Sequence, residues 1–295
     1  MFGVLKLNKG KNASSRDVVN VVQRLVKPHK AGHAGTLDPM ATGLLLVCVG
    51  KATKLISVLQ DTRKVYSAEF LLGQRSDTDD ATGNVVHTPN CAPIRRETVE
   101  SALRQFVGEI SQVPPVFSAI KKNGQRAYAK ARRGETVELE ARPVTVYSIN
   151  VVDFDWPRLT LTIECGSGTY IRSIARDLGN ALECGALMSS LVRTAVGEFS
   201  IDNSVTTDDL TAENVDCHLT DPVEIVQHLN RYRCDDSDEA AVAIGRPISV
   251  RGDSLQNMSQ ADDRVAMTSQ DGDRLLAMGI FQQDRCVIQP RNVFI

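Results

Sequence analysis

One short segment near the start of this 295-residue chain restricts its fold more than any other. Residues 32–39 read GHAGTLDP. Glycines permit tight backbone turns, and Pro39 fixes its own φ while it biases Asp38 toward an extended conformation. The segment therefore predicts a loop that presents the Asp38 carboxylate. Taken alone, an aspartate in such a loop is more often a turn residue that caps the next element.

Hydrophobic periodicity around this loop predicts an α+β fold. Alternating or continuous apolar runs predict strands over residues 3–7, 44–49, 65–71, 144–151, 159–165 and 187–200. Helical spacing predicts helices after Ser14, over 51–59, 97–110 and 127–133, and from Tyr170 to Leu182 with Thr169 as N-cap. A first domain over residues 1–210 is expected to end near the polar segment 201–222. Short runs beyond it predict a small β domain over residues 222–295.

The net charge of −2 hides an uneven distribution of charge along the chain. Residues 1–75 carry 12 Lys and Arg against 4 Asp and Glu, and residues 121–142 carry 7 against 3. Residues 202–295 carry 8 against 17. A basic face can attract a polyanion such as nucleic acid, whereas the acidic part is expected to stay away from phosphate. Solubility alone is the alternative explanation of this asymmetry.

Cysteine usage and hydropathy exclude several classes of protein. The seven cysteines are scattered, and none lies in a C-x-x-C motif or at zinc-like spacing from a histidine. Neither a disulfide framework nor structural zinc is therefore expected. The sequence has no apolar run of about 18 residues that predicts a membrane span, and no secretory signal is recognisable. We expect a cytoplasmic protein.

The motifs between residues 3 and 200 resemble, in the same order, those of the TruB family of tRNA pseudouridine synthases. The GHAGTLDP segment matches the family pattern G-H-x-G-x-L-D-P. The further matches are Lys9, Tyr66 in a K-x-Y context, the acidic turn 76–83, QVPPVFSA at 112–119, GSGTYIR at 166–172 and the run 191–199. Gly10 and Phe117 depart from the family, which has proline and tyrosine at these places.

The resemblance implies three catalytic residues. Asp38 is the expected nucleophile, which attacks C1′ or C6 or abstracts the 2′-proton to give a glycal, and the sequence leaves these routes open. Tyr66 is expected to stack on the target uracil and is a candidate for proton transfer, although a strand tyrosine is usually a packing residue. Arg172 is expected to pair with Asp38 and to keep it ionised by lowering its pKa. An arginine in the first turn of a helix is otherwise more often a surface residue.

The resemblance also implies residues that contact the substrate. His33 is expected to fill the space that the flipped nucleotide leaves, Tyr170 to line the uracil pocket, and Leu191 to pack on the other face of the base. Without the family resemblance, His33 would be interpreted as a loop histidine whose hydrogen bonds are made within the protein, and Leu191 as a residue of the hydrophobic core. Asp80 is expected in the hydrogen-bond network of the site, and its turn lacks the spacing of a calcium loop. The remaining predicted contacts are Lys9, Arg193 and, in a basic insertion over about 111–142 that grips the RNA stem-loop, Lys121 and Arg126.

The glycines before the predicted helix at Tyr170 expose backbone N–H groups, which are a natural site for an anion. The implied fold is the pseudouridine synthase fold, a mixed, mostly antiparallel sheet flanked by helices, followed by a small PUA-like β domain. The implied reaction converts uridine 55 of the tRNA T arm to pseudouridine after the base is flipped out. No cofactor or metal is expected, because the detached uracil is its own acceptor, and we expect a monomer that acts on tRNA.

Three alternatives remain open at this point. A guide-dependent pseudouridine synthase shares these motifs, but the chain lacks long lysine-rich extensions and its C-terminal part is acidic. A non-catalytic tRNA-binding or folding chaperone would not need the set of Asp38, Tyr66 and Arg172. An aspartate-based hydrolase would need a second carboxylate or a metal, and neither is evident.

Overall fold

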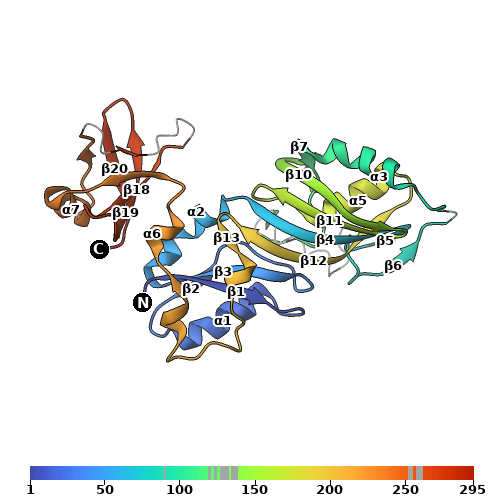
Figure 1. Cartoon of the computed structure of the whole chain (residues 1–295), viewed down its shortest axis with the longest axis horizontal. Helices are drawn as coiled ribbons and strands as arrows, with labels where there is room; N and C mark the ends of the chain where they lie inside the picture. The colour runs from blue at the N-terminus through green and yellow to red at the C-terminus, as the bar shows by residue number, and fades with distance from the viewer. Residues whose placement is uncertain are drawn as a thin grey trace.

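The computed structural model describes residues 1–89, 91–118, 121–122, 125–126, 133, 139–251, 255–256 and 262–295. Within this part of the chain the molecule consists of one large sheet with helices against it and a smaller sheet at one end (Figure 1). The predicted α+β class and the mixed, mostly antiparallel sheet are confirmed. The large sheet carries the loop of Asp38 and half of the other predicted site residues, namely Lys9, His33, Tyr66, Leu191 and Arg193.

Ten of the described strands form the large sheet, in the order β14-β1-β3-β12-β4-β11-β10-β7, with β2 on β3 and β13 on β12. Their bounds are β1 Gly3–Lys9, β2 Ala31–His33, β3 Thr42–Val49, β4 Lys64–Leu72, β7 Gly108–Gln112, β10 Arg142–Asp155, β11 Arg158–Cys165, β12 Ala186–Val196, β13 Phe199–Ser200 and β14 Leu219–Thr220. Two short hairpins accompany the sheet, β5 Gln74–Ser76 with β6 Val85–His87 and β8 Lys121–Lys122 with β9 Gln125–Arg126.

The large sheet is divided at the pair β3 and β12. Among its described strands this pair alone is parallel, and it joins only Val192 to Thr42 and Arg193 to Gly43. Gly43 has φ 101°, and a Cβ at this position would lie 2.4 Å from the carbonyl oxygen of Arg193. A glycine is therefore required where the two backbones approach each other this closely.

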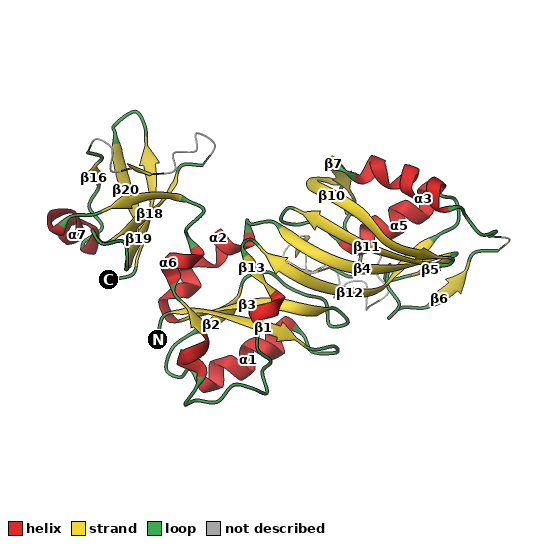
Figure 2. Ribbon diagram, in the orientation of Figure 1, coloured by secondary structure: helices red, strands yellow, loops and turns green. Residues whose placement is uncertain are grey.

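Three helices pack against the large sheet and share its main hydrophobic core. They are α1 Ser15–Leu25, α3 Arg96–Leu103 and α5 Ile171–Ala181. Figure 2 shows α1 beside β1, β2 and β3, and α3 and α5 beside β10 and β11. Ser14 begins α1 as its N-cap, and Asp17 completes a capping box. The apolar stripe of α1, with Val18 and Val22, packs against the sheet residues Leu5 and Leu45 in this core.

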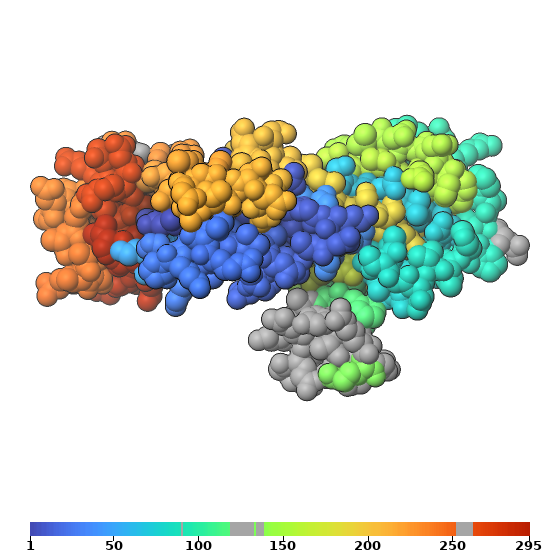
Figure 3. All heavy atoms as spheres, turned by 90° about the horizontal axis from the view of Figure 1, so that it is seen from below, coloured from blue at the N-terminus to red at the C-terminus, as the bar shows by residue number. Residues whose placement is uncertain are grey.

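A second sheet of the described residues has the order β16-β20-β19-β18-β15-β17. Its elements are β15 Asn230–Arg233, α7 Asp236–Ala243, β16 Ile248–Ser249, β17 Leu255–Gln256, β18 Arg264–Thr268, β19 Leu275–Gln282 and β20 Val287–Val293. The segment between the two sheets contains the 3₁₀ turns Ile201–Asn203 and Val215–His218 and the short helix α6 Pro222–Ile225. Figure 3 shows this sheet at the end of the molecule, beside the N-terminal part of the chain.

The smaller sheet is attached to the 3₁₀ turn η1 Gly50–Leu55 and the helix α2 Ile56–Gln60, which follow β3. The Lys51 ammonium donates to the carbonyl of Phe294, and the Lys54 ammonium donates to that of Val293 over 2.8 Å. The rings of Phe2 and Phe294 stack with their centroids 5.2 Å apart. Basic residues of the N-terminal part thus meet backbone oxygens of the acidic C-terminal part.

Several sequence predictions of secondary structure were wrong in detail. The helix predicted over 97–110 ends at Leu103, and after a 3₁₀ turn the strand β7 begins at Gly108, whose φ of 102° does not continue a helix. The small domain predicted to consist of short β runs also contains the helix α7, and α5 has Tyr170 as its N-cap instead of Thr169. The polar segment 201–222 includes β14, which pairs with β1. The helix predicted over 127–133 falls outside the described residues apart from residue 133.

All seven cysteines are free thiols. No helix in the described ranges is long and apolar enough to cross a membrane.

Candidate active site

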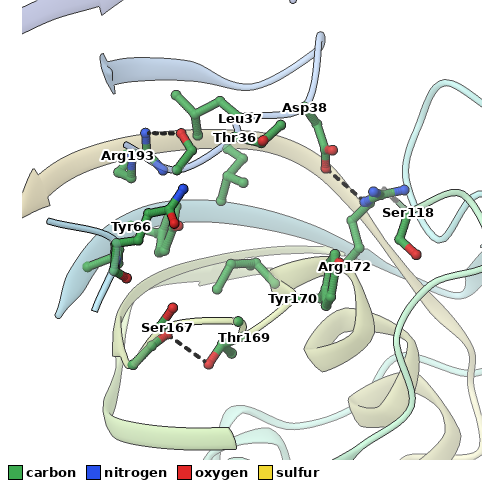
Figure 4. Close-up of a pocket in the computed structure, with 17 residues that line it drawn as sticks. Thr36, Leu37, Asp38, Tyr66, Ser118, Ser167, Thr169, Tyr170, Arg172 and Arg193 are labelled. Carbon is green, nitrogen blue, oxygen red and sulfur yellow. Dashed lines mark hydrogen bonds and ion pairs between the residues drawn. The ribbon is translucent and has the colours of Figure 1, made fainter. Parts of the chain in front are cut away.

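A cavity of about 300 Å³ lies over the centre of the large sheet, with Asp38 and Arg172 on its wall (Figure 4). Its lining comes from five separate segments of the chain: the loop before β3, the end of α2 with the start of β4, the loop and first turn of α5, the middle of β12, and Ser118. The sheet order explains this convergence, because β12 pairs with β4 on one side and with β3 on the other.

Asp38 and Arg172 form the ion pair that the sequence predicts. Nε of Arg172 lies 2.9 Å from Oδ2 of Asp38, and its side chain is 5% exposed against 34% for Asp38. The Nε–H does not meet hydrogen-bond geometry toward this oxygen, so the contact is electrostatic rather than a linear hydrogen bond. Burial of the guanidinium fixes its position, while the carboxylate remains accessible from the cavity.

Arg172 lowers the pKa of Asp38 as predicted, but this effect is outweighed. Burial in the cleft raises the pKa of the Asp38 carboxyl above its ordinary value, and the charge of Asp80 raises it as well, whereas Arg172 lowers it. Loss of hydration thus outweighs the attraction of the guanidinium. The sequence shows the partner of a carboxylate but not the depth of its burial.

Asp80 joins the same guanidinium from the other side. Its Oδ2 lies 3.4 Å from Nη1 of Arg172, and both side chains are 5% exposed. Its Oδ1 accepts hydrogen bonds from the Thr78 hydroxyl and from the backbone N–H and hydroxyl of Thr82. Arg172 also donates to the carbonyls of Thr78 and Phe117, both over 3.1 Å. Asp80 thus lies in a hydrogen-bond network beside Arg172, and Arg172 holds three segments of the chain together.

Lys9 lies behind the Asp38 loop and not against the cavity. Its side chain is 1% exposed, and its ammonium donates to the carbonyls of Gly10, Ala13 and Pro39 at 2.9, 2.7 and 3.3 Å. All three N–H groups are thereby used, so the predicted contact of Lys9 with substrate is not supported by this geometry. Burial lowers the pKa of Lys9 to about 8, although the charge of Asp38 raises it.

Ser15 holds the same loop from α1. Its hydroxyl accepts the N–H of Leu37 over 2.8 Å and lies 3.2 Å from the carbonyl of Leu37. Together with the contact from Lys9 to Pro39, this anchors the chain on both sides of Asp38. The carboxylate is thus held on a loop whose backbone is tied to β1 and α1.

Tyr66 and Arg193 face each other across paired strands, β4 and β12, on the opposite side of the cavity from Arg172 (Figure 4). Arg193 is 1% exposed, and its guanidinium donates to the carbonyls of Leu44 and Gly35 over 2.8 and 3.2 Å. Burial raises the pKa of the Tyr66 phenol, and the guanidinium of Arg193 opposes this rise. Both residues line the cavity.

Tyr170 and Leu191 also line the cavity, and His33 does not. The guanidinium carbon of Arg142 lies over the ring of Tyr170, 5.1 Å from the ring centroid. Its backbone N–H donates to Gln112, and the N–H of Gly166 donates to Thr145. Two of the N–H groups expected to bind an anion are therefore already occupied. His33 lies on β2, half-buried, before the Asp38 loop.

Lys121 and Arg126, which were predicted to contact RNA, lie opposite each other on the antiparallel strands β8 and β9. Their side chains fall outside the described residues, as do residues 119–120, 123–124, 127–132 and 134–138 of the predicted insertion over 111–142.

Sequence reasoning missed three residues that line the cavity: Gln60, Lys64 and Ser118. The alternation of β4 was a usable signal, because Lys64 and Tyr66 lie two residues apart and share a face of the strand. Burial lowers the pKa of Lys64 to about 8, and its ammonium donates to the carbonyls of Gln60 and Thr62. Ser118 had a sequence signal only as part of the QVPPVFSA motif.

Family models match most of the chain on both sides of this site. Residues 23–171 match the N-terminal domain of the TruB family pseudouridylate synthases, and residues 172–230 match the C-terminal domain of tRNA pseudouridylate synthase B. The chain belongs to the TruB family. Its activity is therefore that of a pseudouridine synthase, an isomerase. The boundary between the two matches lies just before Arg172, so this TruB cavity combines residues of both.

Curated TruB relatives are similar over most of this chain. The tRNA pseudouridine synthase B of Clostridium kluyveri is 43% identical over 73% of this chain and 74% of its own length. Those of Dehalococcoides mccartyi and Xanthomonas campestris pv. campestris are 41% and 38% identical and cover 85% and 92% of this chain, and 85% and 88% of their own lengths. A solved Cbf5-Nop10-Gar1 complex contains a chain with a TM-score of 0.78 at 27% identity, which covers all of this chain and 85% of that one.

Proposed function

We propose that this TruB-family chain converts uridine 55 in the T arm of tRNA to pseudouridine, with Asp38 as the nucleophile. The observation that carries the proposal is the Asp38–Arg172 ion pair on the wall of a cavity that also contains Tyr66. Among the described residues that line this cavity, Asp38 is the one carboxylate. A reactive carboxylate, a buried guanidinium to orient it and an aromatic ring for the base are thus within one site.

The reaction breaks the N1–C1′ bond, rotates the uracil and forms the C5–C1′ bond, while C5 loses its proton to solvent and N1 gains one. In our proposal the target base leaves the stack of the stem-loop and lies on the ring of Tyr66, with Leu191 on its other face. Asp38 then attacks C1′ or C6, or removes the 2′-proton. Each route requires an ionised Asp38, and its raised pKa predicts that activity falls at acidic pH.

The proposed substrate is free tRNA, because the curated relatives carry the name tRNA pseudouridine synthase B. A guide-dependent reaction is the second candidate, since solved chains of similar fold belong to a Cbf5-Nop10-Gar1 complex and to an H/ACA RNP bound to a substrate RNA. Activity on tRNA without any added RNA or protein separates the two candidates.

The remaining parts of the proposal concern the whole molecule. Residues 1–210 would form the catalytic domain and residues 222–295 a PUA-like domain, which stabilises the catalytic part through contacts such as Lys54 with Val293. The protein would act in the cytoplasm as a monomer on its tRNA partner. It would need neither metal nor cofactor, because the detached uracil is rejoined to its own ribose. Sedimentation equilibrium of the protein, with and without tRNA, tests whether it is a monomer.

Tritium release from tRNA transcripts labelled at uridine C5 tests the function. Wild-type protein is expected to release one equivalent per tRNA, and a transcript with cytidine at position 55 is expected to release none. The Asp38→Asn variant keeps the shape of the side chain but is expected to lose at least about a thousandfold in rate, as when a nucleophile is removed. Full activity of this variant, or release from the cytidine-55 transcript, would refute the proposal.

A further inference from the structure

A guanidinium with unused N–H groups lies at the rim of the cavity. Arg142, the first residue of β10, donates from Nη2 to the carbonyl of Gly168, and its guanidinium carbon lies over the ring of Tyr170. Gly168 and Tyr170 both line the cavity, and Gly168 is also exposed to solvent. A Cβ on Gly168 would lie 3.3 Å from Nη2, so the loop and the guanidinium are in close contact. Arg142 is thus held where the cavity meets solvent.

Arg142 differs from the other cations of the site because its charge is not compensated. Arg172 pairs with carboxylates, and Arg193 and Lys64 donate to backbone carbonyls. Within the described part of the chain, Arg142 forms no ion pair, and Nη2 alone of its nitrogens has a hydrogen-bond partner, Gly168. Its Nε is buried, whereas Nη1 remains open to solvent. A guanidinium with free N–H groups at an accessible place attracts an anion, and its planar fork fits a phosphate.

The place of Arg142 matches the path of a nucleotide that enters the cavity. In Figure 4, Tyr170 lies on the same side of the cavity as Arg172, and Tyr66 lies on the opposite side. If the base lies on Tyr66 and Asp38 acts at the glycosidic bond, the sugar and its phosphates continue toward Tyr170 and the guanidinium over its ring. Phosphate is the charged group of RNA, and every internal nucleotide has one on each side.

We propose that Arg142 binds a phosphate that flanks the flipped nucleotide and thereby holds the ribose against Asp38. The contact uses Nη1 and the second N–H of Nη2, which together face away from the bond to Gly168. Backbone N–H groups of the loop do not replace it, because those of Gly166 and Tyr170 donate to protein oxygens. The inference rests on the proposed function only in that the target base is taken to occupy this cavity.

Stem-loops with one neutral linkage test the contact without turnover. Three T-arm stem-loops carry pseudouridine at the target position. One has phosphates throughout, and the other two have a methylphosphonate on the 5′ or the 3′ side of the target. In all three, 2′-fluoro groups on the target and on the preceding nucleotide protect the neutral linkage from hydrolysis. Dissociation constants are measured for wild type and Arg142→Met at one fixed salt concentration, because phosphate contacts depend on salt.

The expected result is a loss of coupling between Arg142 and one phosphate. One of the two neutral linkages is expected to weaken binding to wild type by about tenfold, the effect of a hydrogen bond to a charged group. Arg142→Met is expected to bind the all-phosphate stem-loop about tenfold more weakly and to lose no further affinity for the stem-loop with that neutral linkage. The linkage that shows this coupling identifies the phosphate as the one on the 5′ or the 3′ side.

Arg158→Met is the matched control. Arg158 has an exposed side chain, begins β11 and lies opposite Asp155, at the other end of β10 from Arg142. This variant is expected to keep the full wild-type sensitivity to the neutral linkage. A general disturbance of the site in Arg142→Met would weaken binding of all three stem-loops alike and leave this sensitivity unchanged.

Two outcomes overturn the proposal. One is equal sensitivity of Arg142→Met and wild type to both neutral linkages, whatever their affinities. The other is a wild type that binds all three stem-loops equally well. The nucleophile is tested separately by tritium release from Asp38→Asn, so either idea can fail without the other.

Discussion

The two sides of the cavity bury positive charge in different ways. On one side, Arg172 pairs with two carboxylates, Asp38 and Asp80. On the other, Lys64 and Arg193 direct their N–H groups to backbone carbonyls. We call these the carboxylate side and the carbonyl side. Carboxylates thus compensate the buried cation on the first side, and the dipoles of backbone carbonyls stabilise the two buried cations on the second.

The two sides differ in what their buried cations do. Carbonyl dipoles leave the charge of the cation uncompensated, and Arg193 accordingly lowers the pKa of Lys9 and Lys64 and opposes the rise of the Tyr66 pKa. The carboxylate side keeps an excess of negative charge, and one of its carboxylates faces the cavity. The cations on the carbonyl side hold strands and loops, whereas the cation on the carboxylate side orients a reactive group.

Removal of Arg172 is expected to have the largest effect. Arg172→Met leaves Asp38 and Asp80 without their shared counter-charge, which typically costs about 3–5 kcal/mol of stability. Activity should fall by about a hundredfold or more, because the nucleophile loses its orientation. Urea unfolding and single-turnover tritium release measure the two effects.

A double variant sharpens the comparison. In Arg172→Met/Asp80→Asn one of the two unpaired carboxylates is neutral, so the variant should be more stable than Arg172→Met alone. Equal stability of the two would mean that charge pairing is not what Arg172 contributes.

Arg193→Met is expected to have the second-largest effect. It frees the carbonyls of Leu44 and Gly35, and loss of hydrogen bonds from a charged group predicts about 2–4 kcal/mol of destabilisation. Because no carboxylate is paired with Arg193 in the described residues, combining this change with Asp80→Asn should give additive losses. A rescue by Asp80→Asn here would abolish the distinction between the two sides. Denaturant unfolding of the four proteins completes the test.

The contribution of Lys9 is expected to depend on alkaline pH. Its pKa is about 8 in the folded chain against 10.5 for the free side chain, so between these values the folded state releases a proton that the unfolded state keeps. The unfolded state then binds more protons, and stability rises with pH over this window. The difference in unfolding free energy between wild type and Lys9→Met should therefore shift in favour of wild type from pH 8 to 10.5. A flat difference would show that Lys9 stays charged.

The smallest effect is expected from Asp80→Asn on the pH profile. The charge of Asp80 raises the pKa of Asp38, so its removal should move the acidic limb of the rate profile to lower pH. Single-turnover rates between pH 4 and 7 measure the shift, with Asp77→Asn as control because Asp77 pairs with Asn84 away from Arg172. A shift to higher pH would contradict the assigned charge interaction.

The sequence predicted the parts of this site that depend on spacing. Asp38, Tyr66, Tyr170, Arg172, Leu191 and Arg193 all line the cavity. Local periodicity also predicted β4, β11 and α1 closely, because each has a regular apolar pattern and α1 has a capping serine. The family motifs placed these elements in one fold.

What the sequence did not predict depends on burial in three dimensions. The raised pKa of Asp38 arises from desolvation by segments far apart in the chain. Lys9 looked like an RNA contact because it is a lysine in a motif, but three carbonyls surround its ammonium. The uncompensated charge of Arg142 is invisible in a sequence, since it is defined by the absence of a carboxylate partner among the described residues.

The parallel pair between Gly43 and Arg193 has a mechanical consequence. It joins two antiparallel leaves of the large sheet through two residue pairs, whereas β4 and β12 are paired over nine. Bending of the sheet should therefore concentrate at this line, as a hinge that carries the Asp38 loop on one leaf and Tyr66 on the other. Collective motions of this kind occur on the microsecond to millisecond timescale. The width of the cavity, and with it the admission of a flipped nucleotide, would then be set by flexion of the sheet at Gly43.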